Sequence, residues 1–368
     1  MGVGIAEAES NSYEMTTSGL VNPGESAMAF VRTKPAPVSL DSDALVEIRR
    51  GERFGYPLLV ACRDGSVDLA VWLSRHREPV RRWVHDCGAV LFRNFGVDSP
   101  EAFRIVTRAL HDGDCSSSGE HPLLNDDEGL YDTVFHPPEQ PIFWHSENSH
   151  LPEWPMRITF CCVEAPVSGG VTTLTDSERV VQALEPELIN RFTRVGVSYQ
   201  RVFGGGLGLA WQRAFRSNDR NEVERRCREA QCDLTWLSSD RLRIRWLRPA
   251  VVRHPVSGAR VWFNQVTHFH PRMLPPQTRE PLEALLPPEE LPRNCWFGDG
   301  EPIGAEALEQ LCAAHRAHEH GVPWRRGDVL TVDNMKLAHA RTPFSGRRRL
   351  LVGLGELRPE GRDWWRVS

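Results

Sequence analysis

The sequence predicts a mainly β fold with flanking helices, formed as one sandwich or barrel. Two observations lead to this prediction. Short β-prone runs separated by Gly or Pro turns recur along the chain, for example at residues 242–247, 250–252 and 260–264, a pattern typical of antiparallel sheets. The helical segments do not alternate regularly with these runs, as they would around a parallel sheet. With 368 residues, 40% of them hydrophobic, the chain can bury a large core.

Composition separates an N-terminal arm from the rest of the chain. Residues 1–36 are rich in Ser, Thr, Glu, Gly and Pro and are predicted to be disordered, whereas residues 37–368 are predicted to form a single domain. The arm has no long apolar segment, so we expect neither a signal peptide nor a membrane anchor. A net charge of −5 without a basic block gives no support for nucleic-acid binding. Nine scattered cysteines without a Cys-x-x-Cys pair predict a reduced, cytoplasmic protein.

The first elements of the domain follow from helix signals. Residues 67–75 have the apolar spacing of a helix, and Pro79 is suited to the first turn of a second short helix. A short buried strand is expected at 88–92. Ser99, followed by a proline and an acid, then predicts the start of a helix that runs through Leu110.

The rest of the chain consists mostly of predicted strands. Residues 112–140 come first; they are polar and turn-rich without a period, and a loop of this length in a compact domain predicts a lid over a functional site. The other predicted elements are strands at 156–163, 169–176, 329–333 and 347–354, and helices at 177–194, 219–230 and 304–320.

Residues 143–150, Phe-Trp-His-Ser-Glu-Asn-Ser-His, form the strongest candidate for a metal site. In an extended segment, side chains two residues apart point to the same face, so His145 and Glu147 are expected on one side. Residues 332–341 offer His339 as a candidate third ligand. Two histidines and one carboxylate leave three positions of an iron ion open, as in non-haem Fe(II) oxygenases.

The His-x-Glu spacing alone is weak support, because His76 and Glu78 share it. That second tripeptide ends a helical run, has polar neighbours and is best interpreted as a solvated helix junction. For His145 and Glu147 themselves, the alternative to a metal site is an ordinary loop or core histidine.

An ordered series of motifs extends from about Gly88 to Arg358. With these motifs the chain resembles the taurine dioxygenase family of Fe(II)/2-oxoglutarate-dependent oxygenases, and within it the branch of syringomycin-type amino-acid hydroxylases. The motifs are Phe-Arg-Asn-Phe (92–95), Pro-Pro-Glu-Gln (137–140) leading to His-Ser-Glu (145–147), Gly-Gly-Val-Thr (169–172), Arg-His-Pro (253–255), Trp-Phe-Asn-Gln (262–265), Gly-Asp-Gly-Glu-Pro-Ile (298–303), Gly-Asp-Val-Leu (327–330) and His-Ala-Arg-Thr-Pro-Phe (339–344) into Arg-Arg (348–349).

The resemblance implies a fold, a ligand set and cofactors. The fold is a distorted double-stranded β-helix, or jelly roll, which agrees with the many short strands. The iron ligands are His145, Glu147 and His339, and the cofactors are Fe(II), 2-oxoglutarate as co-substrate and O₂. Halogenases of the wider group lack the carboxylate ligand, so the presence of Glu147 argues against halogenation.

The far carboxylate of 2-oxoglutarate calls for a guanidinium group, whose planar fork matches a carboxylate. By resemblance we favour Arg349, with Thr172 as a neighbouring hydroxyl. The spacing from His339 differs by one residue from that in taurine dioxygenase, so Arg348 is a real alternative. Adjacent strand residues point oppositely, and only one of the two can face the pocket.

The resemblance further implies an enzyme that couples oxidative decarboxylation of 2-oxoglutarate to hydroxylation of an unactivated C–H bond. The expected substrate is a small amino-acid-like molecule, free or carried on a peptidyl carrier protein, in natural-product pathways such as antibiotic biosynthesis. Desaturation or epoxidation by the same oxidant is an alternative outcome. Relatives carry a Ser-Pro-Arg-like segment before the metal strand where this chain has residues 115–120, Cys-Ser-Ser-Ser-Gly-Glu, which leaves the substrate open.

Two residues are candidate substrate contacts, and two other classes of function compete with the oxygenase. His270 lies in a segment that lines the active-site mouth of relatives, and Asn264 is either a substrate contact or a buried, hydrogen-bonded residue. A zinc hydrolase could use the same His, Glu and His ligands. A non-catalytic binding protein on the same fold is the second rival.

Overall fold

The structure is a computed structural model that describes residues 42–51, 54–113, 130–133 and 136–359. By its internal contacts the chain divides into two units, Met1–Ser39 and Leu40–Ser368. The arm expected at 1–36 lies outside the described residues, as does most of the lid expected at 112–140. Both expectations stay predictions.

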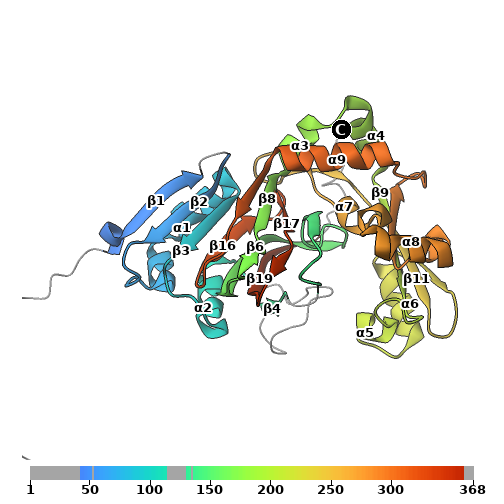
Figure 1. Ribbon diagram of the computed structural model, residues 1–368, viewed down its shortest axis with the longest axis horizontal. Coiled ribbons are helices and arrows are strands. Elements are labelled where there is room, and N and C mark those ends of the chain that lie inside the picture. Colours follow the sequence, from blue (N-terminus) through green and yellow to red (C-terminus); the bar gives the residue numbers. More distant parts are fainter. Residues whose placement is uncertain (1–41, 52–53, 114–129, 134–135, 360–368) are drawn as a thin grey trace, which may run out of the picture. The chain divides into compact units, whose positions relative to one another are not determined.

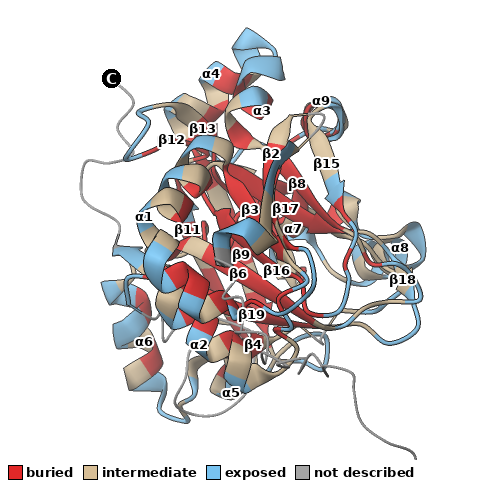
Figure 2. Cartoon of the chain, turned by 90° about the vertical axis from the view of Figure 1, so that its left-hand side faces the viewer, coloured by how far each residue is buried: buried red, intermediate tan, exposed pale blue. Residues whose placement is uncertain are grey.

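The largest sheet has seven strands in the order β1-β2-β3-β16-β6-β19-β4. All neighbouring strands are antiparallel except β2 and β3. Helices α1 and α2 cover one face of this sheet and bury an apolar layer against it (Figures 1 and 2). The strands are β1 Val46–Gly51, β2 Gly55–Cys62, β3 Ala89–Arg93, β4 Leu130–Asp132, β6 Glu153–Glu164, β16 Val329–Asp333 and β19 Arg349–Pro359, and the helices are α1 Leu69–Cys87 and α2 Pro100–Leu110.

A second sheet of four strands, in the order β15-β8-β17-β5, faces the first. Apolar side chains from both sheets meet in one buried cluster, which includes Phe160 and Leu330 from the first and Leu174 and Leu337 from the second. Two sheets packed in this way form the sandwich that the sequence predicted. The strands are β5 Ile142–His145, β8 Thr172–Asp176, β15 Glu319–Val322 and β17 Leu337–Arg341, and a two-stranded ribbon, β7 Ser168–Gly169 with β18 Phe344–Ser345, adjoins them in the chain.

The middle of the chain forms a third layer with its own core. A four-stranded sheet, β10-β11-β9-β14, packs its inner face on helices and on the pair β12-β13. Its strands are β9 Val197–Phe203, β10 Asp233–Trp236, β11 Leu242–Arg248 and β14 Arg293–Phe297; the pair is β12 Val251–Arg253 and β13 Arg260–Trp262. The helices are α3 Ser177–Ala183, α4 Pro186–Val195, α5 Trp211–Phe215, α6 Arg220–Glu229, α7 Val266–Phe269, α8 Pro276–Leu285 and α9 Ala305–Ala317, with 3₁₀ turns at Ser42–Leu45, Pro271–Met273 and Pro288–Glu290.

The first two helices begin at capping residues. Asp68 caps α1 by accepting a hydrogen bond from the backbone N–H of Val71, and Ser99 caps α2. Helix α1 kinks at His76, three residues before Pro79, so the two expected helices form one interrupted helix. Gly88 ends it in the left-handed conformation (φ 81°), where a Cβ would lie 2.7 Å from Leu337.

Several predicted boundaries are wrong. The helix expected at 304–320 ends at Ala317, because Glu319–Val322 pairs with β8 as strand β15. The helix expected at 177–194 is two helices, because the chain extends at Leu184 and restarts at Pro186. The final strand begins at Arg349 and continues to Pro359.

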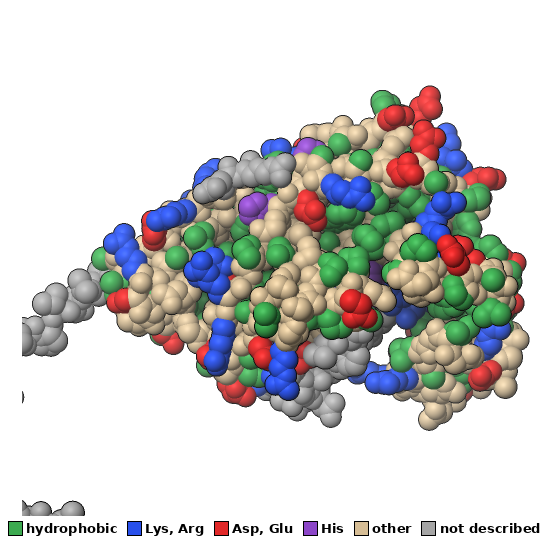
Figure 3. Space-filling view, viewed as in Figure 1, with side chains coloured by type: hydrophobic (Ala, Val, Ile, Leu, Met, Phe, Trp, Pro, Cys, Tyr) green, Lys and Arg blue, Asp and Glu red, His purple; other side chains and the backbone are tan. Residues whose placement is uncertain are grey.

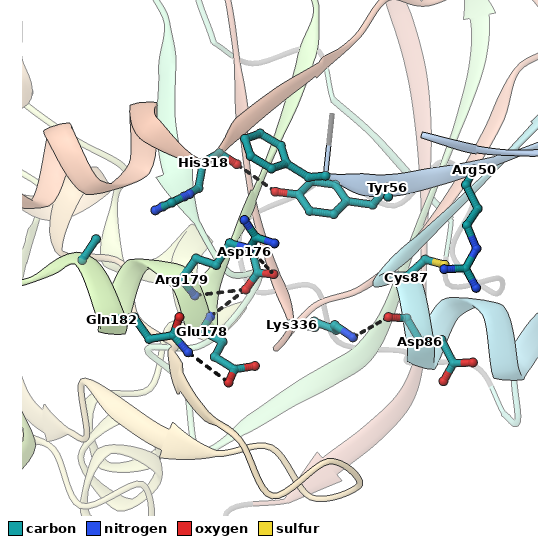
Figure 4. Close-up of a pocket in the computed structure, with 13 residues that line it drawn as sticks. Arg50, Tyr56, Asp86, Cys87, Asp176, Glu178, Arg179, Gln182, His318 and Lys336 are labelled. Carbon is teal, nitrogen blue, oxygen red and sulfur yellow. Dashed lines mark hydrogen bonds and ion pairs between the residues drawn. The ribbon is translucent and has the colours of Figure 1, made fainter. Parts of the chain in front are cut away.

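Two hollows are visible on the molecule. Figure 3 shows a recess with histidine and Lys or Arg side chains inside it, between the part that carries β17 and the part that carries α8 and β11. A second hollow of about 630 Å³ lies where the end of α1 meets the start of α3 (Figure 4). Its polar lining includes Asp86, Asp176 and Lys336, and none of the predicted site residues is among its described lining residues. Over the described residues, no helix combines the length and apolar character that a bilayer crossing requires.

Candidate metal centre and co-substrate site

The three candidate metal ligands meet at one end of the second sheet. Strands β5 and β17 are antiparallel, and their register sets His145 directly opposite His339, so both imidazoles project from the same face. Their ring centroids lie 4.2 Å apart. The Oε2 atom of Glu147 lies 3.9 Å from Nε2 of His145 and 4.0 Å from Nε2 of His339. One ligand atom from each residue can be chosen so that all lie within 4.8 Å of one another, and this donor set fits Fe(II).

Glu147 reaches this point through a turn. Strand β5 ends at His145, and residues 147–150 form a turn in which Asn148 has a φ of 55°. The expectation of one extended segment carrying both ligands is therefore wrong in its geometry, although the two side chains do converge. A left-handed backbone is tolerated by asparagine more readily than by most residues.

Asn334 fixes the turn that carries Glu147. Its Oδ1 accepts a hydrogen bond from the backbone N–H of Glu147 at 2.7 Å, and its Nδ2 donates to the carbonyls of Glu147 at 2.9 Å and Pro155 at 2.8 Å. The side chain is fully buried. Since every one of these bonds is to backbone, the amide sets the position of the carboxylate through the main chain.

The ring orientation of His145 follows from a backbone contact. Its Nδ1 lies 2.8 Å from the carbonyl oxygen of Phe143, which requires the proton on Nδ1 and leaves the Nε2 lone pair facing Glu147. Phe160 packs edge-on against His339, with ring centroids 5.4 Å apart. An apolar wall therefore borders the three ligands on the side of the first sheet.

A buried ionic group supports the turn before β17. Asp333 lies 3.1 Å from Nε2 of His254 and 3.3 Å from Arg157, and its Oδ1 accepts hydrogen bonds from the backbone N–H groups of Met335 and Lys336. Burial alone would raise the pKa of Asp333, but the hydrogen bond with His254 and the charge of Arg157 lower that pKa below its ordinary value. The carboxylate thus shapes the segment between Asn334 and His339.

Thr172 and Arg348 lie together on the same face as His339. The register pairs Arg341 with Thr172 and His339 with Leu174, so Thr172 and His339 share a face of the sheet. The guanidinium of Arg348 donates to the carbonyl of Gly170 at 3.0 Å and to Oγ1 of Thr172 at 3.4 Å. A Cβ on Gly170 (φ 62°) would lie 2.9 Å from Cδ of Arg348, so this position requires glycine.

Arg349 points elsewhere. Its Nε forms an ion pair with Asp132 at 3.0 Å, toward the β4 side of the first sheet. Because adjacent residues alternate, only Arg348 reaches Thr172, and the preference for Arg349 does not fit the geometry. Burial, together with the neighbouring charge of Arg341, lowers the pKa of Arg348 to about 10, so the group stays charged at neutral pH.

Both candidate substrate contacts form hydrogen bonds with the backbone. The amide of buried Asn264 donates to the carbonyl of Ala250 at 2.9 Å and accepts from the N–H of Val266 at 3.0 Å. His270 caps a 3₁₀ turn by accepting from the N–H of Arg272. Neither placement supports substrate contact, and the assignment stays a prediction.

His268, rather than His270, lies beside the candidate metal ligands. It lies on α7, and its ring stacks on that of His145 with centroids 5.1 Å apart. In the sequence, His268 and His270 are two residues apart and would share a face in an extended segment, but the helical turn of α7 separates their directions. The other His-x-Glu tripeptide lies at the kink of α1, where His76 contacts the carbonyl of Trp72.

Over most of its length the chain is similar to one protein family and to two individual proteins. The model of the family described as "Taurine catabolism dioxygenase TauD, TfdA family" matches residues 55–354. The chain is 34% identical over 297 residues to the dapdiamide synthesis protein DdaC of Enterobacter agglomerans, covering 80% of this chain and 90% of that protein. It is 28% identical over 282 residues to a clavaminate synthase-like protein of Arabidopsis thaliana, covering 74% and 82%.

The fold also has a counterpart among solved structures. The PvcB protein of Pseudomonas aeruginosa superposes with a TM-score of 0.53 at 16% identity, over 88% of this chain and 99% of that one. This likeness concerns the fold alone and confirms the mainly β, jelly-roll prediction. The family match spans most of the described domain. The chain belongs to the taurine dioxygenase (TauD/TfdA) family, and it is a 2-oxoglutarate-dependent non-haem iron dioxygenase that uses Fe(II), 2-oxoglutarate and O₂.

Proposed function

We propose that this enzyme hydroxylates an unactivated C–H bond of an amino acid, free or attached to a peptidyl carrier protein, in natural-product biosynthesis such as that of a peptide antibiotic. The observation that carries the proposal is the convergence of His145, Glu147 and His339 on the sheet face that also bears Thr172. Support for a biosynthetic role comes from the 34% identity to a dapdiamide synthesis protein across 80% of the chain.

His145, Glu147 and His339 are the proposed iron ligands. The two imidazoles present Nε2 atoms toward Glu147, and the Nδ1 contact with Phe143 holds the His145 ring in that orientation. Bound Fe(II) supplies O₂ activation coupled to the oxidative decarboxylation of 2-oxoglutarate to succinate and CO₂. Asn334 keeps the carboxylate of Glu147 in place by bonding the backbone on both sides of it.

Arg348 and Thr172 are the proposed partners of the far carboxylate of 2-oxoglutarate. Oγ1 of Thr172 accepts hydrogen bonds from Nε1 of Trp324 at 2.9 Å and from Arg348. A hydroxyl that accepts from two donors can still donate its own proton to a carboxylate oxygen. The guanidinium of Arg348 supplies the compensating charge. The two residues together form a charged and a neutral donor on one side of the metal ligands.

Arg341 holds the segment that leads into β5, the strand that carries His145. Its guanidinium donates to the carbonyls of Pro137 at 2.7 Å and Gln140 at 2.6 Å, which precede β5. These bonds hold the segment before His145 against β17, so Arg341 acts on the site through the backbone. Because its guanidinium bonds these backbone carbonyls, we assign Arg341 a positioning role and not a catalytic one.

The alternatives to a hydroxylase are a zinc hydrolase, a binding protein, and a desaturase or epoxidase that uses the same oxidant. Membership of a dioxygenase family speaks against the zinc-hydrolase and binding-protein alternatives, whereas desaturation and epoxidation would use the same site.

The cysteines bear on the cellular compartment. All eight in the described part of the chain carry free thiols: Cys62, Cys87, Cys161, Cys162, Cys227, Cys232, Cys295 and Cys312. Free thiols favour a reducing compartment, and we propose the cytoplasm.

The test is a reconstitution followed by a substrate screen. Protein loaded anaerobically with Fe(II) and 2-oxoglutarate is exposed to O₂ with free and carrier-bound amino acids, and succinate and product masses are measured. We expect substrate-dependent succinate and a product heavier by one oxygen atom; a product lighter by two hydrogens assigns desaturation instead. Zinc-dependent hydrolysis without succinate would contradict the proposal.

A further inference from the structure

Two buried side chains at the start of α7 bond the backbone around the first proposed iron ligand. Oγ1 of Thr267 donates a hydrogen bond to the carbonyl of Trp144 at 2.5 Å. Nε2 of Gln265, the residue before the helix, donates to the carbonyl of Ser146 at 3.0 Å. The backbone is therefore held from α7 both before and after His145.

Each of these bonds fixes the peptide group that enters a proposed iron ligand. The carbonyl of Trp144 belongs to the peptide that joins it to His145, and the carbonyl of Ser146 belongs to the peptide that joins it to Glu147. The N–H of that second peptide donates to Asn334 at 2.7 Å. This peptide is thus held at both ends, and its rotation would turn the carboxylate away from the two histidines.

Strand β5, which carries His145, has a neighbouring strand on one side only. Within the described residues it is the outermost strand of its sheet, next to β17. The outer edge of such a strand presents backbone groups that no further strand can bond. Thr267 and Gln265 supply donors to this segment from another element, and their exposed fractions are 2% and 4%.

The start of α7 is itself fixed to the third layer. The backbone N–H of Gln265 donates to the hydroxyl of Tyr199 at 2.9 Å, and Tyr199 is a fully buried residue of β9. Phe269, at the end of the helix, packs against the same ring with centroids 5.0 Å apart. The core of the third layer therefore determines where the two side chains point.

A ring contact from the same helix limits the orientation of His145. The His268 ring stacks on the imidazole with an interplanar angle of 30°, and Nε2 of His268 lies 2.9 Å from Nη1 of Arg293 on β14. Three neighbouring residues of one segment, 265, 267 and 268, thus contact residues 146, 144 and 145.

On these contacts, and resting on the iron ligands of the proposed function, we propose that Gln265 and Thr267 are positioning residues for the metal centre. They connect the third layer to the segment that carries His145 and Glu147, and they set the direction of both ligands through the backbone. Ligands must be held within about 0.5 Å of their productive geometry, and bonds that orient them contribute about 10- to 100-fold to metal affinity.

The experiment measures Fe(II) affinity and stability separately. Full-length protein freed of metal is titrated with Fe(II) without O₂, and the iron-free protein is unfolded in urea. Thr267→Val nearly keeps the shape of the side chain and removes the donor, so we expect iron affinity to fall about 10- to 100-fold. Thr267→Ser keeps the hydroxyl and should restore most of the affinity.

Gln265→Met should have a smaller effect in the same direction. Methionine has a similar length but no N–H donor. The carbonyl of Ser146 also accepts a hydrogen bond from the hydroxyl of Ser149 at 2.8 Å, so the substitution leaves this carbonyl with a donor. The same titration should give an iron affinity between those of the wild type and Thr267→Val.

Thr107→Val is the matched control. Thr107 is a buried residue of α2, and its Oγ1 donates to the carbonyl of Arg104 at 2.9 Å. Helix α2 packs on the face of the first sheet that points away from the second sheet. The control should lower the urea midpoint about as much as Thr267→Val does and should keep the iron affinity of the wild type.

Three results would overturn the inference. They are wild-type iron affinity in both Thr267→Val and Gln265→Met, equal losses of iron affinity in Thr267→Val and Thr107→Val, and a Thr267→Ser variant that binds iron as weakly as Thr267→Val. In each case a wild-type protein that binds Fe(II) leaves the proposed ligands intact. A wild-type protein that binds no Fe(II) would instead contradict the ligand set of the proposed function, and the inference with it.

Discussion

The second and third sheets differ in whether their residues near the metal centre can be recognised in the sequence. The β15-β8-β17-β5 sheet carries His145, His339 and Thr172, each within a short motif that can be recognised in the sequence. The β10-β11-β9-β14 sheet carries Arg201 and Arg293, which lie about ninety residues apart and in no motif. Metal and co-substrate chemistry requires fixed residue types, whereas a substrate can be recognised from any strand that faces the site.

The two sheets also differ in the contacts that hold their residues in place. The ligands of the second sheet depend on backbone bonds made by Asn334 and Arg341 and on the buried Asp333. On the third sheet, the strand register sets Arg201 opposite Arg293, and Arg293 also contacts His268 of α7 at 2.9 Å. Mutations should therefore affect the two regions in different ways.

The largest effect is expected at the metal ligands. His339→Ala removes one of three donors, and we expect iron binding and substrate-coupled succinate formation to fall by about 1,000-fold or more. Iron content after anaerobic loading is the direct measurement. The matched control is His76→Ala, which alters the other His-x-Glu tripeptide at the kink of α1. Iron retained by His339→Ala, or lost equally in both variants, would contradict the ligand assignment.

The next effect distinguishes the two neighbouring arginines. Arg348→Met should raise the KM for 2-oxoglutarate by about 30- to 100-fold, because a buried charge-assisted contact is lost. Arg349→Met removes only a partly exposed ion pair with Asp132, which contributes about 0–1 kcal/mol to stability and nothing to co-substrate binding. Steady-state kinetics of both variants decides between them; the reverse order would restore Arg349 as the co-substrate ligand.

A smaller effect should separate positioning from stability. Asn334→Ala removes three bonds to backbone, and we expect iron affinity to fall about 10- to 100-fold. Asn264→Ala is the control, since this buried amide also bonds only to backbone but away from Glu147. Both variants should lose about 1–3 kcal/mol of unfolding free energy. Equal iron affinity in the two variants would show that Asn334 has no positioning role.

A change of pH should affect the stability of the fold independently of the site. Burial lowers the pKa of His111, beside the first sheet, and of His315, stacked on Trp144, to about 4. Both histidines have a pKa near 6.5 when unfolded. Below that pH the unfolded chain takes up protons that the folded chain does not.

Stability should therefore fall as the pH decreases from about 6.5 toward 4. Between pH 7 and pH 5 the two histidines should together cost roughly 2–4 kcal/mol of unfolding free energy. Urea titrations at the two values test this, with His111→Gln and His315→Gln as comparisons. Stability that is unchanged or higher at pH 5 would contradict the expected direction.

Local signals in the sequence predicted much of the fold. The caps at Asp68 and Ser99 and the apolar run of β6 have causes that act within a few residues, and the corresponding elements are present. The predicted end of α9 was wrong because it depends on the pairing of Glu319–Val322 with β8, whose residues lie 144 to 150 positions away in the chain. Tertiary pairing of this kind leaves no local signal.

The candidate site shows the same difference between residues found by local motifs and residues placed by tertiary structure. The ligand motifs identified His145, Glu147 and His339 as candidates, and the structure brings them together. The choice between Arg348 and Arg349 depended on the register of β19, where an irregularity falls between Arg349 and Leu350. The placement of His268 depended on a helical turn.

The most direct test of the central claim is the visible charge-transfer absorption that forms when 2-oxoglutarate chelates protein-bound Fe(II) in the absence of O₂. The wild-type protein should develop this band at saturating 2-oxoglutarate. His339→Ala should not develop it, and Arg348→Met should develop it only at much higher 2-oxoglutarate concentrations. A wild-type protein that binds iron but shows no band, or a His339→Ala variant that shows the full band, would contradict a site built from His145, Glu147, His339 and Arg348.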